Sequence, residues 1–186
     1  MRGAATGRAF FLMKLTDNDF ALFGLPERQQ QERAEIDARW KSLQAQVHPD
    51  RFASEGAAAQ RVAMQWAVRV NEAHKRLRDP LARAAYLCEL RGAPIQANEN
   101  TAMPASFLME QMEWREALDE AVGVAAIEAL DVEVDQREKT LLSEVQQLLD
   151  DENDATTAAS AAAQKVRALM FVQRFRSDIA KRLDNA

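Results

Sequence analysis

A histidine, a proline and an aspartate stand together at positions 48 to 50, within the stretch VHPDRF. An imidazole beside a carboxylate is a pair that can move protons, so catalysis is the first possibility to test. Catalysis by His48 and Asp50 would also need a nucleophile and a third, orienting group, and the sequence indicates neither. Metal binding has still less support. We therefore predict no catalytic residue and no metal ligand, and ask how the chain positions these side chains.

The residues before the motif have the periodicity of a helix. Pro49 has no N–H to donate, and it disfavours the α conformation at His48, so the preceding helix should end near Val47. The apolar positions of that helix recur at spacings of four, three and four residues: Ile36, Trp40, Leu43 and Val47.

A second helix follows the ASEG segment and should end at the RDP segment, residues 78 to 80. Two such helices can pack antiparallel, which places His48 and Asp50 at the tip of a helical hairpin. A shorter helix should follow, closed by Gly92. His74 is expected at the surface, and Cys88 is expected to be a small buried residue. The apolar positions of the second helix are Ala63, Trp66, Val70, Ala73 and Leu77.

Composition restricts the class of protein. The chain has 186 residues, is 47% hydrophobic and 28% charged, and contains only 6 Gly and 5 Pro, which favours a few long helices over many short strands. A net charge of −5 argues against binding to nucleic acid. No apolar run approaches the roughly 20 residues that span a bilayer. A single cysteine excludes an internal disulfide and fits a reducing compartment. The glycines form no phosphate-binding loop, so we expect no bound nucleotide and no cofactor.

The first fifteen residues are basic and contain no acid. Their apolar core, residues 9–13, is shorter than that of a usual secretory signal. We predict an extension outside the folded part, with Met13 as an alternative start and a short organellar presequence as the other possibility. The folded part should begin at Thr16 or Asp17, where TDNDFALFGLP combines a helix cap, an apolar turn and a stop.

The segment FLMEQMEWREALDEA, residues 107–121, carries more apolar side chains than one buried stripe requires. At about 100° per residue, Phe107, Trp114, Leu118 and Ala121 share one side of the helix. The nearly opposite side is apolar with acidic neighbours, which is typical of a surface that binds a partner, although another helix could cover it. Its residues are Leu108, Met109, Met112, Glu113, Glu116 and Glu120.

Two further helices should complete a three-helix bundle. Phe171 lies about 100° from the centre of the last apolar stripe, so it either emerges beside the methionine-rich face or is purely packed. One helix runs from about Val124 to Leu149, and the other carries the final stripe. Their apolar positions are Ile127, Leu130, Val134, Leu141, Val145 and Leu148, then Leu169, Val172, Phe175, Ile179 and Leu183.

Several of these segments together resemble the HscB family, the J-domain co-chaperones of iron–sulfur cluster assembly. The resemblance rests on DFALFGLP, HPDRFA at the hairpin tip, VNEAHKRLRDPLARAAYL, and FLMEQMEWREALDEA, and it extends from about Asp17 to Leu183. It implies an all-α fold in two domains: a J domain at 16–79, a linker with a short helix at 80–100, and a C-terminal three-helix bundle at 101–186. Residues 1–15 lie outside it.

The resemblance also implies partners. The tip and the helix before it would bind a DnaK-type ATPase resembling HscA, through His48, Pro49, Asp50, Arg39, Lys41 and Arg51. One feature departs from J proteins, in which this helix is usually basic: Glu27, Glu32, Glu35 and Asp37 offset Arg28, Arg33, Arg39 and Lys41. Long-range attraction to an acidic chaperone surface should therefore be modest.

The face on residues 107–121 would bind an iron–sulfur scaffold resembling IscU, through the six face residues given above and Phe171. We expect an adaptor without enzymatic activity, in the bacterial cytoplasm, or in the mitochondrial matrix if the N-terminal extension is a presequence. No membrane partner is expected. Two alternatives stay open: a J protein that serves another client, and an enzyme built on a helical bundle.

Overall fold

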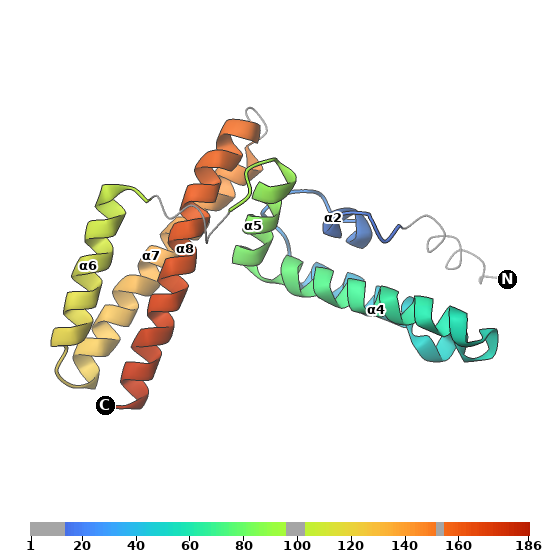
Figure 1. The fold of residues 1–186 in the computed structure, drawn as a ribbon. Coiled ribbons are helices and arrows are strands. Elements are labelled where there is room, and N and C mark those ends of the chain that lie inside the picture. Colours follow the sequence, from blue (N-terminus) through green and yellow to red (C-terminus); the bar gives the residue numbers. More distant parts are fainter. Residues whose placement is uncertain (1–13, 96–102, 152–154) are drawn as a thin grey trace. The chain divides into compact units, whose positions relative to one another are not determined.

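The structure is a computed structural model that describes residues 14–95, 103–151 and 155–186, with side chains from 157 onward in the last range. All regular secondary structure in these ranges is helical (Figure 1). The chain divides into two compact units, Met1–Arg83 and Ala84–Ala186. None of the described helices has the length and apolarity needed to cross a membrane. The expected all-α fold is confirmed for the described residues.

The first helix of the first unit is short, and its two ends are set by local chemistry. Helix α2 (Asp19–Phe23) begins after Asn18, whose side-chain oxygen accepts a hydrogen bond of 2.8 Å from the backbone N–H of Ala21. It ends at Gly24, which adopts a left-handed conformation with φ of 62°. The stretch DFALFGLP thus forms a capped turn, and the predicted extension at residues 1–15 lies largely outside the described residues.

Helices α3 (Arg33–Val47) and α4 (Ala57–Arg78) form the predicted hairpin. Helix α3 ends at Val47, as predicted from Pro49. The motif itself is not an irregular loop, because residues Pro49–Glu55 form a 3-10 helix, η2. The side chains buried between α3 and α4 are Ile36, Leu43 and Val47 from α3, and Ala63, Trp66, Val70, Ala73 and Leu77 from α4.

A buried carboxylate ties α2 to α4. The side chain of Asp19 has no exposed surface, and its two oxygens lie 2.7 Å from Nη2 of Arg69 and 3.3 Å from Nη1 of Arg76. Burying a carboxylate is tolerated only when cations and hydrogen bonds compensate for the lost hydration. The two arginines are seven residues apart, so they share one face of α4. Sequence analysis treated this segment as a polar cap and missed the ion pair.

The prediction that His74 is a surface residue is wrong. Its ring stacks on Trp40 with centroids 4.7 Å apart, and its Nε2 lies 2.7 Å from Oδ1 of Asp37. The histidine therefore joins α4 to α3 at the edge of the hairpin core. The prediction failed because it considered only the apolar residues of α4. The contact surface of α3 also includes the half-buried Trp40 and Asp37, which contact His74.

Helix α5 (Pro80–Leu90) crosses the division between the units and ends before Gly92, which has φ of 77°. The residues after α5 are held by the second unit. Nη1 of Arg91 donates to the carbonyl of Leu149 at 2.7 Å, and Nη1 of Arg167 donates to the carbonyl of Ile95 at 3.2 Å. Much of the predicted linker at 80–100 therefore packs as part of the second unit.

The single cysteine lies inside α5. Cys88 is fully buried, and burial raises the pKa of its thiol to about 11. A thiol with so high a pKa stays protonated at neutral pH, so it is a poor nucleophile and a poor metal ligand. The expectation of a small buried residue is confirmed.

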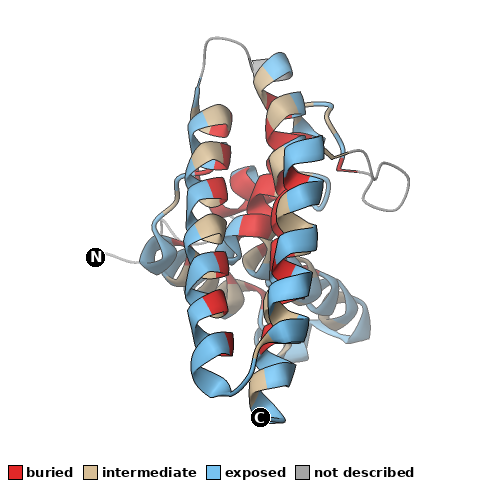
Figure 2. Ribbon diagram, turned by 90° about the vertical axis from the view of Figure 1, so that its left-hand side faces the viewer, coloured by how far each residue is buried: buried red, intermediate tan, exposed pale blue. Residues whose placement is uncertain are grey.

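The second unit contains three long helices, α6 (Ala105–Glu120), α7 (Val124–Asp150) and α8 (Ala155–Asp184). Figure 1 shows α6 and α8 running in the same direction, with α7 antiparallel to both. The buried residues lie on the sides that the helices turn toward one another (Figure 2). The predicted core positions Leu148 and Leu183 are only half-buried, whereas Leu149, which was not predicted, is fully buried. The 3.6-residue repeat of the helix shifts the stripe by one position over this length.

Candidate functional site

The hairpin tip is shaped by its backbone. His48 has an extended backbone with ψ of 125°, which ends α3 and begins η2. Its Nδ1 accepts a hydrogen bond of 3.3 Å from the backbone N–H of Asp50, and its carbonyl accepts one of 3.0 Å from the N–H of Arg51. His48 therefore caps the 3-10 helix that carries the aspartate, while Pro49 occupies the first position, where no N–H is needed.

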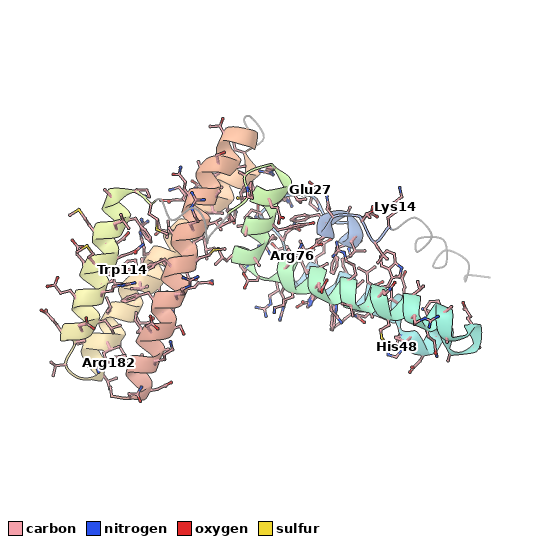
Figure 3. The ribbon with its side chains drawn as sticks, viewed as in Figure 1. Lys14, Glu27, His48, Arg76, Trp114 and Arg182 are labelled. Atoms are coloured by element: carbon pink, nitrogen blue, oxygen red, sulfur yellow. The ribbon has the colours of Figure 1, made fainter. Side chains whose placement is uncertain are left out.

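The tip presents its polar groups to solvent. The side chains of His48 and Asp50 are 56% and 89% exposed, and η2 has no buried residue. Figure 3 shows His48 at the end of the hairpin. Nδ1 of His48 lies 3.6 Å from Oδ2 of Asp50, so the two groups are adjacent. Among the described residues no group of three or more His, Cys, Asp or Glu side chains is arranged to hold a metal ion.

The basic residues predicted around the tip do not form one patch. Nη1 of Arg51 donates to the carbonyl of Ala45 at 2.9 Å, which fixes its side chain against the end of α3. Arg39 pairs with Glu35 at 3.2 Å, one turn earlier on α3. Lys41 is exposed, but residues two positions apart on an α-helix point about 160° away from each other, so Arg39 and Lys41 lie on different sides of α3.

Helix α6 exposes one side and buries the other. Leu108, Met109 and Met112 are 46%, 62% and 70% exposed, whereas Phe107 and Trp114 are 4% and 3% exposed. The three predicted glutamates, Glu113, Glu116 and Glu120, are also exposed. Within the second unit, no described helix covers this side of α6, so the packing of the bundle leaves it free for a partner. We call these six exposed residues the α6 face.

Phe171 joins the interior of the bundle to its surface. It is half-buried, and it belongs to a cluster of four aromatic rings, two from α6 and two from α8. Phe107 and Phe171 form a T-shaped pair with centroids 5.9 Å apart, and Phe175 stacks on Phe171 at 6.2 Å. Trp114 in turn stacks on Phe175 at 5.9 Å. Packing and exposure, which sequence analysis treated as alternatives for Phe171, therefore both hold.

Sequence analysis missed one residue beside this ring. The guanidinium carbon of Arg115 lies 5.5 Å from the centroid of Phe171, within the range of a cation–π interaction. A signal was present in the sequence, because Arg115 is the single base in an α6 that carries five acids. Its partner comes from α8, however, and the pattern of α6 alone does not identify it.

Comparison with known proteins agrees with this architecture. Residues 103–180 match the protein family described as "HSCB C-terminal oligomerisation domain". The chain is 44% identical to the co-chaperone protein HscB homolog of Burkholderia mallei over 176 residues, which cover 93% of this chain and 98% of the relative. That relative is named as a co-chaperone and not as an enzyme.

Two solved structures have the same fold over nearly the whole chain. The chaperone HscB from Vibrio cholerae has a TM-score of 0.75 and 32% identity, and covers 91% of this chain and 99% of its own. The human co-chaperone protein HscB has a TM-score of 0.82 and 25% identity, and covers 90% and 83%. The chain belongs to the HscB family of co-chaperones, which serve iron–sulfur cluster assembly.

Proposed function

We propose that this protein binds an iron–sulfur scaffold protein resembling IscU through the α6 face and Phe171, and delivers it to a DnaK-type chaperone resembling HscA. The tip of the first unit binds the ATP-bound chaperone and promotes hydrolysis of its ATP. One observation carries the proposal: each of two separate compact units exposes a surface that its own packing does not use. An adaptor needs two such surfaces, and it needs no chemistry of its own.

The tip offers the chaperone an exposed carboxylate on a backbone that is held in place. Asp50 is 89% exposed, and its backbone N–H is bound by His48. A charge-assisted hydrogen bond from an arginine of the chaperone would contribute about 1.5–3 kcal/mol. Because Arg39 and Lys41 point to different sides of α3, the chaperone contact would use the tip with one side of α3 and not both.

The α6 face offers the scaffold apolar anchors with an acidic margin. Leu108, Met109 and Met112 supply flexible and aliphatic contact area, and methionine adapts well to an uneven partner. The exposed glutamates disfavour an acidic partner surface and favour a basic one. Phe171 adds a half-exposed ring beside them. The family resemblance, together with this arrangement, makes an IscU-like protein the proposed partner.

The proposed setting is the bacterial cytoplasm, where the buried reduced Cys88 would be stable. A mitochondrial matrix location would require the N-terminal extension to act as a presequence, and that segment lies almost entirely outside the described residues.

The test measures two quantities on the full chain. Single-turnover ATP hydrolysis by a DnaK-type chaperone is followed with this protein, with the scaffold, and with both, and scaffold affinity is measured by calorimetry. We expect stimulation by the protein alone and greater stimulation with the scaffold present. Stimulation without any scaffold affinity would identify a J protein with another client. Absence of stimulation would contradict the assignment of the tip.

A further inference from the structure

We propose that Arg115 is a positioning residue for scaffold binding: its guanidinium holds the Phe171 ring in the orientation that makes it part of the binding surface. The inference rests on the proposed function, and it names a residue outside the predicted contact set. Its basis is the placement of one cation against one half-exposed ring.

Two aromatic rings and one cation contact the Phe171 ring. Phe107 and Phe171 form a T-shaped pair with centroids 5.9 Å apart and an interplanar angle of 86°, and Phe175 stacks on Phe171 at 6.2 Å with an angle of 7°. Both of these rings belong to the bundle core. The guanidinium of Arg115 lies over the ring at 5.5 Å and is the polar, exposed member of the set. Without it, the ring would lose its contact with a charged group and keep its contacts with the two core rings.

Arg115 lies between the buried stripe and the α6 face. By helical advance it is about 80° from Phe107, about 20° from Leu108 and about 60° from Met112. Met112 is three residues earlier and hence a direct neighbour on the helix surface. A side chain at this position reaches α8 without covering Leu108 or Met112. Arg115 therefore fixes the aromatic edge of the surface while the apolar anchors of α6 stay exposed.

The charges of α6 leave Arg115 available for the ring. Its five acidic residues include Asp119, four positions after Arg115, where an ion pair along the helix would be expected. Yet none of the ion pairs among the described residues includes Arg115, whereas Glu110 pairs with Arg137 of α7 at 2.8 Å. The interaction that the structure records for Arg115 is the one with Phe171.

The test compares two substitutions with a matched control in the full chain. Arg115→Gln removes the cation, and Arg115→Lys retains a charge with poorer planar stacking. The control is Arg182→Gln, because Arg182 is also exposed and lines a groove together with Leu118 and Asp119 of α6. Arg182 is eleven positions after Phe171 on α8 and so about three turns away from the ring.

The first measurement uses the free protein with 4-fluorophenylalanine at position 171. We expect Arg115→Gln to shift and broaden the fluorine signal, Arg115→Lys to shift it less, and Arg182→Gln to leave it unchanged. An unchanged signal in Arg115→Gln overturns the proposal. Because no scaffold is present, this readout is independent of the proposed function: if the wild-type chain binds no scaffold, the proposed function fails and the fluorine signal still decides the role of Arg115.

The second measurement is scaffold affinity by calorimetry in a double-mutant cycle with Phe171→Leu. Arg115→Gln should weaken binding by about 2–30-fold, the range expected for a cation–π contact, and Arg182→Gln should not. In the Phe171→Leu background, Arg115→Gln should have almost no further effect, because its action passes through the ring. An equal loss in both backgrounds would show that Arg115 contacts the scaffold directly and would overturn the positioning role.

Discussion

The hairpin tip and the α6 face both project polar and apolar groups into solvent, but they are built in different ways. The tip takes its shape from the backbone: Pro49, the cap by His48 and a 3-10 helix with no buried residue. The α6 face is the outer side of a helix whose inner side is anchored by Phe107 and Trp114. One surface is thus set by consecutive residues, and the other by packing on the far side of a helix.

This difference has consequences for substitution. At the tip, neighbouring residues in sequence act together, and none of them supports a core. On α6, a shift of one residue passes from a binding surface to the interior of the bundle. Substitutions at neighbouring positions of α6 should therefore alternate between those that lower stability and those that weaken binding. Substitutions at the tip should lower the activity of the chaperone partner and leave stability unchanged.

The largest effect is expected from Phe107→Ala, one residue away from the α6 face. Phe107 is 4% exposed and contacts the rings of Trp114 and Phe171, so its removal leaves a cavity among aromatic rings. The free energy of unfolding should fall by about 3–5 kcal/mol. Urea unfolding measures this. The control is Leu108→Ala, which should change stability by less than about 0.5 kcal/mol; equal losses would remove the distinction between the two sides of α6.

The next effect concerns the α6 face itself. Replacing Leu108, Met109 and Met112 together by Ala should weaken scaffold binding by about 100-fold or more, since each buried anchor contributes about 1 kcal/mol or more. Stability should change little, because all three side chains are exposed. Calorimetry and thermal melts on the same preparations give both quantities. A melt lowered as far as that of Phe107→Ala would mean that these residues are core.

At the tip, Asp50→Ala should abolish most of the chaperone stimulation and leave scaffold affinity unchanged. The lost charge-assisted hydrogen bond corresponds to about 1.5–3 kcal/mol, or about 10–150-fold in affinity for the chaperone. The measurement is single-turnover ATP hydrolysis at saturating scaffold. Lys41→Ala serves as a control for general charge loss near the tip, with a smaller expected effect. Near-normal stimulation by Asp50→Ala would contradict the role of the tip.

Local patterns predicted much of this structure. The end of α3 at Val47 followed from Pro49, and the alternation of α6 followed from helical spacing, because both depend on residues close in sequence. The exposed state of Leu108, Met109 and Met112 agrees with the prediction from spacing. The binding roles of these residues, and of the tip residues, stay predictions.

Contacts between distant helices were not predictable in the same way. The buried Asp19 meets Arg69 and Arg76, which lie fifty and more positions later. The cation over Phe171 likewise comes from another helix. Charged residues usually lie on the surface, so the sequence provided no reason to look for a buried partner of Asp19. Only the packed structure shows which of these charges pair with a buried carboxylate and which lie over an aromatic ring.

The smallest effect is expected from acid, in the hairpin that supports the tip. A hydrogen bond from His74 to Asp37, aided by the charge of Arg78, holds the pKa of the Asp37 carboxyl below its ordinary value of 3.8. A carboxyl with a lowered pKa in the folded state stabilises the fold at every pH above the ordinary value, and this contribution is lost as the pH falls through the lower, folded-state value. The hairpin should therefore lose stability below about pH 4.

Asp37→Asn removes this titration while keeping the size of the side chain. Urea unfolding of the wild type and of Asp37→Asn, followed by the NMR signals of α3 between about pH 2.5 and 6, should show a shallower acid decline in the variant. Signals from α7 provide an internal control, because the pKa of Asp135 there is also lowered, chiefly by a hydrogen bond from Lys139, and is untouched by the substitution. The effect should be modest, since the Asp37 side chain is 32% exposed and water screens its charge partners. An identical acid decline of α3 in both proteins would show that the bond between Asp37 and His74 does not stabilise the hairpin.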